Sequence, residues 1–159
     1  MTAEKSQSVK LAETAVWRLL KIRGRSEQEI RDRLKRKNFS ESVIQQTLRY
    51  FREAGFLDDR RFARDWTQAR LNRPFGLNRI RMELVKKGIA SDLVRETLDQ
   101  AKEEQDELAV VCKLIERRKA HYEGLEPLKA KQRLFGFLSR KGFSTGTIIK
   151  AIKEWNKRS

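Results

Sequence analysis

The chain has 159 residues, of which 37% are charged and 38% are hydrophobic, and Lys and Arg exceed Asp and Glu by 15. A single cysteine excludes an internal disulfide, and no apolar run approaches the ~20 residues that a membrane span needs. The net charge favours a polyanionic partner, meaning nucleic acid or a protein that carries it, and the alternative is a solvated surface kept soluble by its charge.

The chain nearly repeats its own sequence. Residues 26–48 align with residues 76–98 at an offset of 50, and a weaker third copy lies 54 residues further on. Helix formers dominate, so the repeats predict an all-α protein built as an elongated tandem array of three three-helix repeats. The predicted parts are a flexible tail (1–7) and the repeats 8–54, 55–104 and 105–159.

The first repeat opens with an apolar stripe at helical spacing. Ser26 and Glu29 then form the pattern of a capping box, in which hydroxyl and carboxylate each satisfy a backbone N–H of the other residue. The next helix runs to about Lys37 with Ile30 and Leu34 inward, and a third helix follows. The stripe of the first helix comprises Leu11, Ala12, Ala15, Val16, Leu19 and Ile22.

The turn between the second and third helix of each repeat carries the sharpest structural signal. Asn38, Gly88 and Gly142 occupy equivalent positions, and all three tolerate the left-handed conformation that ends a helix. An apolar residue follows each, and a leucine lies four residues before each, which is the pattern of a Schellman cap. Gly55 followed by Phe56 predicts a similar cap, and Asp58 is the predicted N-cap of the next helix.

Few residues point to catalysis. Cys112 lies on an apolar stripe, which favours a core thiol over a nucleophile. His121 is in a connection and has no orienting partner nearby in the sequence. Metal-ligand spacing and a glycine-rich phosphate loop are both absent, so the sequence predicts a protein without enzymatic activity, metal or cofactor.

Basic residues are the stronger candidates for function. On the helix that begins at Leu77, helical phase places Arg79, Glu83 and Lys86 on the outer face, where Arg79 and Glu83 are also spaced as an ion pair. The alternative is a solvent face held by such pairs. Phe75, between Arg73 and Arg79, is a candidate to stack on a base or to be buried between helices.

The segment from Gly55 to Leu98 resembles the RecX family of bacterial recombination regulators. The motifs are GFLDDRRFA, the run Gly76-x-x-Arg79-Ile80-Arg81-x-Glu83-Leu84, and Lys87-Gly88-Ile89. The resemblance extends from about Leu11 to Ile152 and is weakest in the third repeat. Leu77 departs from the pattern, because many relatives have proline there.

The resemblance implies a non-enzymatic, monomeric, cytoplasmic protein of DNA repair and the SOS response. Family members bind the RecA filament and inhibit its recombinase and co-protease activities, and many bind DNA, single- or double-stranded. Contact residues are inferred from charge and helical phase, not from the family. They are Arg60, Arg61, Arg64, Arg79 and Lys86 in the middle repeat, with Arg31, Arg33, Arg140 and Lys141 flanking them.

The alternative function is a sequence-specific transcription factor, because three-helix units with a tight turn resemble helix-turn-helix modules. A recognition helix would carry base-reading side chains in its first turns. The third helices instead begin SESVIQQTL, ASDLVRETL and STGTIIKAI, with acidic and small residues and little arginine. The sequence therefore favours the RecA regulator.

Overall fold

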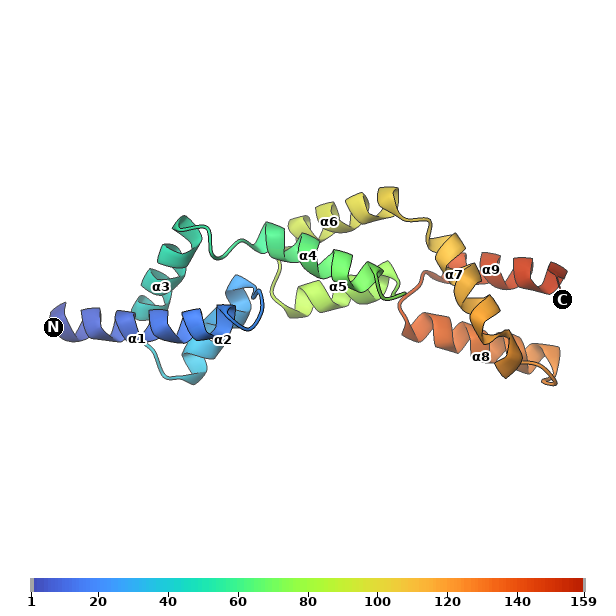
Figure 1. Ribbon diagram of the computed structural model, residues 1–159, viewed down its shortest axis with the longest axis horizontal. Coiled ribbons are helices and arrows are strands. Elements are labelled where there is room, and N and C mark those ends of the chain that lie inside the picture. The colour runs from blue at the N-terminus through green and yellow to red at the C-terminus, as the bar shows by residue number, and fades with distance from the viewer. Residues whose placement is uncertain (1, 159) are drawn as a thin grey trace. The chain divides into compact units, whose positions relative to one another are not determined.

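The computed structural model describes residues 2–158, with the side chains of residues 6–157. These residues form nine α-helices and one short 3₁₀ helix (Figure 1). The helices are α1 (Thr2–Leu20), α2 (Glu27–Arg36), α3 (Glu41–Glu53), α4 (Asp59–Leu71), α5 (Leu77–Lys86), α6 (Ser91–Glu104), α7 (Glu107–Arg118), η1 (Lys119–His121), α8 (Pro127–Arg140) and α9 (Thr145–Arg158).

The chain divides into two compact units. One contains the residues up to Asp65 together with Leu84–Leu93, and the other contains Trp66–Glu83 together with the residues from Val94 onward. The middle repeat therefore contributes residues to both units, while the first and third repeats each belong to one.

The core of the first unit lies between α1, α2 and α3. Its fully buried side chains include Val16, Ile30, Leu34 and Phe51, and Trp17 packs edge-on against Phe51 with 5.0 Å between ring centroids. Because two of the three helices are only 10 and 13 residues long, their stability depends on this shared apolar face.

Two expectations for the first helix differ from the structure. Leu11 and Ile22 are 59% and 75% exposed rather than buried, because the inward face of α1 follows Val9, Ala12 and Val16, and the helix ends at Leu20. Residues 2–7, predicted as a flexible tail, belong to α1, and no Gly or Pro separates them from the apolar stripe. Met1 lies outside the described residues.

The core of the second unit includes α7, α8 and α9. Val111, Ile115, Leu134, Leu138 and Ile148 are almost completely buried there. Cys112 packs at the edge of this core as a half-buried thiol, with Sγ 3.5 Å from a carboxylate oxygen of Glu154. Cys112 therefore packs against the core, as predicted from its place on an apolar stripe.

The three predicted Schellman caps are present. Asn38, Gly88 and Gly142 have φ of 62°, 74° and 87°. In each cap the N–H of the apolar residue that follows donates to the carbonyl of the leucine five residues before it, from Phe39 to Leu34 (3.3 Å), from Ile89 to Leu84 (3.1 Å) and from Phe143 to Leu138 (3.3 Å). The repeated turn fixes how the second and third helices of a repeat connect.

Candidate interaction surfaces

The beginning of α2 is held against the cap that follows α5. The Ser26 hydroxyl donates to the carbonyl of Lys87 at 2.6 Å, and it also accepts the N–H of Glu29 at 3.2 Å as the N-cap of α2. A Cβ at Gly88 would lie 2.4 Å from the Cβ of Gln28. We call this contact the first joint; it requires both a small hydroxyl residue and a residue without a side chain.

The second unit contains an equivalent contact, the second joint. The N–H of Gly76 donates to the carbonyl of Lys141 at 2.9 Å, and the N–H of Asn78 donates to the carbonyl of Gly142 at 3.1 Å. A Cβ at Gly76 would lie 2.2 Å from the carbonyl carbon and oxygen of Gly142. Gly76 is therefore required for close backbone contact.

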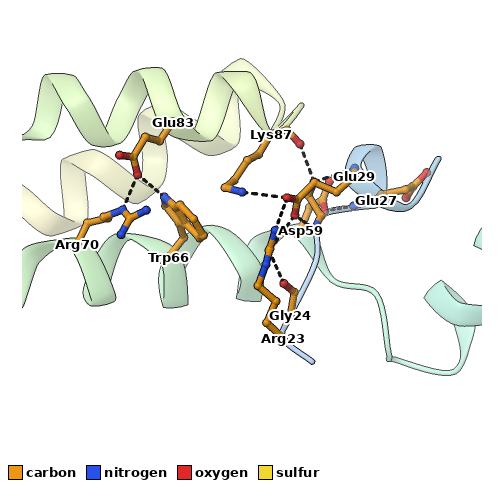
Figure 2. Close-up of polar contacts among 10 residues, drawn as sticks. Arg23, Gly24, Glu27, Glu29, Asp59, Trp66, Arg70, Glu83 and Lys87 are labelled. Carbon is orange, nitrogen blue, oxygen red and sulfur yellow. Dashed lines mark hydrogen bonds and ion pairs between the residues drawn. The ribbon is translucent and has the colours of Figure 1, made fainter. Parts of the chain in front are cut away.

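Glu29 is the centre of an ion cluster beside the first joint (Figure 2). Its carboxylate accepts from Arg23 at 2.7 Å and from Lys87 at 3.0 Å, and it closes the capping box with the N–H of Ser26 at 3.2 Å. Burial alone would raise the pKa of Glu29, but these donors outweigh burial and lower the pKa from 4.5 to about 2. The cluster thus favours the ionised carboxylate.

Asp59 holds the start of α2 from a different element (Figure 2). Its carboxylate accepts the N–H of Glu27 at 2.9 Å. Burial raises the pKa of Asp59 because the Glu27 N–H only partly compensates for the loss of water. Asp58, its neighbour, caps α4 by accepting the N–H of Arg61 at 3.0 Å, as predicted. The adjacent carboxylates therefore have separate structural roles.

Glu83 on α5 is the centre of a second cluster (Figure 2). It accepts from the indole N–H of Trp66 at 2.9 Å and from the guanidinium of Arg70 at 2.5 Å. A third bond comes from Arg79 at 3.2 Å. Burial would raise the pKa of Glu83, but these three donors outweigh it and hold the pKa below its ordinary value. Arg70 and Arg79 are thereby neutralised within the fold.

Arg79 and Lys86 differ in exposure, although helical phase placed both on the outer face of α5. Arg79 is half-buried, because it turns toward Glu83 and lies over the ring of Phe75 at 4.1 Å. Lys86 is exposed. Lys141 also approaches Phe75, with its ammonium 5.0 Å from the ring centroid. Phe75 is thus half-buried among the cations, consistent with the predicted burial between helices.

The remaining predicted contact residues fall into two groups. Arg33, Arg60, Arg61, Arg64 and Arg140 are exposed, although Arg61 also donates to the carbonyl of Gly55 at 3.0 Å. Arg31 is half-buried in ion pairs with Glu27 at 3.8 Å and with Glu41. The structure brings Arg79 and Lys141 together at Phe75.

Two basic residues that line one cavity, Arg25 and Arg36, are not among the contact residues predicted from the sequence. Arg25, in the connection before α2, lines a cavity together with Arg33 and Arg36. Arg33 and Arg36 are three residues apart on α2 and therefore share a helical face. Arg25 precedes the helix, so the sequence alone does not show that it lies beside this face.

Two further findings concern function classes. Among the side chains of residues 6–157, no group of three or more His, Cys, Asp and Glu is arranged to hold a metal ion. None of the helices formed by residues 2–158 is long and apolar enough to cross a membrane.

Comparison with known proteins covers all three repeats. Family models described as the first, second and third three-helix domains of RecX match residues 12–51, 58–98 and 104–152. The "Regulatory protein RecX" of Amycolatopsis mediterranei is 31% identical over 147 residues, covering 91% of this chain and 83% of that protein. That of Haemophilus influenzae strain PittEE is 30% identical over 151 residues, covering 92% and 98%.

A solved structure supports the same architecture. The crystal structure of RecX from Lactobacillus salivarius matches with a TM-score of 0.84 over 95% of this chain and 98% of that chain, at 20% identity. The predicted all-α fold of three tandem three-helix domains is therefore confirmed. With all three domain models matched and relatives at 30% identity aligned over most of both chains, the chain belongs to the RecX family.

Proposed function

We propose that this protein binds RecA nucleoprotein filaments in the cytoplasm and inhibits their recombinase and co-protease activities, acting in DNA repair and the SOS response without catalysing a reaction itself. The observation that carries the proposal is the match to all three RecX domains, together with relatives named as regulatory proteins. The proposed mechanism is binding in the groove of the filament, where the chain bridges protomers and blocks access for duplex DNA or the repressor.

The charge of the surface supports a nucleoprotein target. The chain carries a net charge of +15. Arg33, Arg64, Lys86 and Arg140, four of the predicted contact residues, are exposed. Cations that remain in solvent are attracted to a polyanionic filament and raise the rate of encounter. We therefore propose these four as contacts, ahead of Arg31 and Arg79, which pair with carboxylates inside the fold.

The third helices do not support the transcription-factor alternative. At the start of α3, Glu41 pairs with Arg31 and lies 3.7 Å from Lys35. At the start of α9, the hydroxyl of Thr147 donates to Glu107 at 2.7 Å. In α3 and α9 the first turns that a recognition helix would present to bases are therefore engaged within their own domains.

The test is inhibition of RecA on single-stranded DNA, measured as ATP hydrolysis and strand exchange during titration with this protein. The variant Arg64→Glu with Lys86→Glu reverses two exposed cations and should weaken inhibition about tenfold or more through repulsion. The matched control Lys113→Glu with Arg117→Glu changes net charge equally on the exposed face of α7. Circular dichroism establishes that both variants are folded.

Each outcome decides something specific. Absence of inhibition by the unsubstituted protein would overturn the proposed function. Equal inhibition by both double variants would leave the function standing and show that Arg64 and Lys86 are not contacts. Arg79 is excluded from the variant, because its reversal would also disrupt the Glu83 cluster and confuse binding with folding.

A further inference from the structure

A cavity of about 350 Å³ lies beside the first two helices of the first domain. Two apolar side chains, Leu19 at the end of α1 and Ile22 just after it, form one part of its wall. The polar part of the wall comprises Arg25, Glu29, Asp32, Arg33 and Arg36. We call the whole cavity the arginine cavity.

Its two carboxylates are already engaged. Glu29 is bound by Arg23 and Lys87 in the Glu29 cluster, and Asp32 accepts from the amide of Gln28 at 2.7 Å. The three arginines form no ion pair with the residues that the structure describes. The remaining arginine of α2, Arg31, differs because it pairs with Glu27 and Glu41. The helix thus has one neutralised arginine and directs two others to the cavity.

Arg25 is in an unfavourable environment without a ligand. Its Nε is buried and has no hydrogen-bond acceptor. Burial lowers the pKa of Arg25, and repulsion from Arg23 and Arg33 lowers it further, although attraction to Glu29 offsets part of this effect. Three arginines face two carboxylates that already have other partners, so an anion entering the cavity would relieve the remaining repulsion among the arginines.

The composition of the wall indicates which anion fits. Each guanidinium offers several N–H donors in a planar fork that matches phosphate oxygens, and three of them suit a phosphate better than a carboxylate with two oxygens. The exposed side chain of Ile22 and the neighbouring Leu19 offer an apolar surface for a sugar or base. A flexible single strand can place one nucleotide in a hollow, whereas a duplex keeps its nucleotides stacked.

We propose that the first domain binds single-stranded DNA through this cavity, with a backbone phosphate on Arg25, Arg33 and Arg36 and the attached nucleoside against Leu19 and Ile22. The proposal concerns DNA alone, and it stands or falls independently of the action on RecA.

The test uses a fluorescently labelled oligo(dT) of about 30 nucleotides, without RecA, and measures binding by fluorescence anisotropy at several salt concentrations. Removal of two charges in Arg33→Gln with Arg36→Gln should weaken binding about tenfold and reduce the slope of log affinity against log salt by up to about 0.7, the value for one phosphate of a single strand. The variant Ile22→Ser should weaken binding several-fold with the slope unchanged, because it removes an apolar contact only. The three substituted residues, Ile22, Arg33 and Arg36, are exposed, so both variants should fold.

The control Lys113→Gln with Arg117→Gln removes the same charge from α7 and should lose less than about threefold. Equal losses in the two double variants would overturn the proposal, because binding would then follow net charge alone. If Ile22→Ser binds the oligonucleotide with unchanged affinity, the nucleoside does not contact Ile22, and that part of the proposal is wrong. Tighter binding of the annealed duplex would refute the preference for a single strand. Displacement of the DNA by polyglutamate at equal charge concentration would instead identify the cavity as a site for acidic protein segments.

Discussion

The Ser26 hydroxyl lies between two backbone groups, 2.6 Å from the Lys87 carbonyl to which it donates and 3.2 Å from the Glu29 nitrogen whose N–H it accepts. One side chain thereby caps α2 and closes the first joint. Replacement by alanine should cost about 2–3 kcal/mol of unfolding free energy, the sum of a lost cap and a buried carbonyl without its donor. Urea unfolding followed by circular dichroism measures this change.

Ser40 provides the control, because it caps α3 by accepting the N–H of Val43 at 3.4 Å and takes no part in a joint. Ser40→Ala should therefore cost only about 1 kcal/mol. If the two alanine variants lose the same stability, the bond to Lys87 contributes nothing measurable.

Gly76 and Gly146 should respond in opposite directions to the same substitution. An added Cβ at Gly76 meets the Gly142 backbone at 2.2 Å, so Gly76→Ala should destabilise the protein by about 1–3 kcal/mol. Gly146 lies in α9 with nothing within 4 Å of an added Cβ, so Gly146→Ala should stabilise it by about 0.5–1 kcal/mol. Thermal unfolding compares the two, and a neutral Gly76→Ala would contradict the close contact of the second joint.

The Glu83 cluster should contribute more than a surface ion pair. Glu83→Gln removes the charge that two half-buried arginines share and should cost about 1–2 kcal/mol. Asp99→Asn, in an exposed pair with Lys102 at 3.7 Å, should change stability by less than about 0.5 kcal/mol. Because Trp66 bonds to Glu83, tryptophan emission should shift in the Glu83 variant only. Equal effects on stability would show that solvent screens the cluster.

The low pKa of Glu29 predicts that the folded protein loses stability in acid. Its pKa of about 2 in the folded protein lies below the ordinary 4.5, so the unfolded chain binds the proton first as the pH falls. The stabilisation is complete above about pH 4.5 and is lost between about pH 4.5 and 2. The shift in pKa sets an upper limit of about 3 kcal/mol on this stabilisation. The actual value is smaller, because the carboxylate is partly exposed to solvent.

The variant Glu29→Gln isolates this effect in urea unfolding between pH 7 and pH 2.5. The difference in unfolding free energy between it and the unsubstituted protein should shrink as the pH falls through this range. A difference that stays constant down to pH 2.5 would mean that Glu29 is not the responsible group.

Local signals in the sequence predicted much of the fold. The caps at Asn38, Gly88 and Gly142 and the capping box at Ser26 depend on residues within a few positions of one another, so the sequence pattern contains them fully. The exposure of Leu11 was missed because two neighbouring apolar residues cannot both face the same core, and the sequence does not say which one does.

The candidate site was less predictable, because pairing between distant residues decides which cations remain exposed. Helical phase placed Arg79 outward, but Trp66 and Arg70 draw Glu83, and with it Arg79, into a cluster that spans 17 residues of sequence. Arg25 lies outside every helix and acquires its neighbours only when the connection folds back beside α2. Such contacts have no periodic signature.

The two joints also depend on the residue at which the second helix of a domain begins. Each joint uses the start of a domain's second helix, at Ser26 and at Gly76, to receive the cap of the domain that follows. The equivalent position in the third domain is Ala130, which is buried one turn inside α8, with its N–H bonded to the Glu126 carbonyl at 3.0 Å. Because α8 begins before this position, the Ala130 N–H is bonded inside its own helix, whereas the equivalent Gly76 N–H is bonded to the cap of the next domain. The residue at which a second helix begins therefore decides whether its first N–H groups can hold another domain's turn.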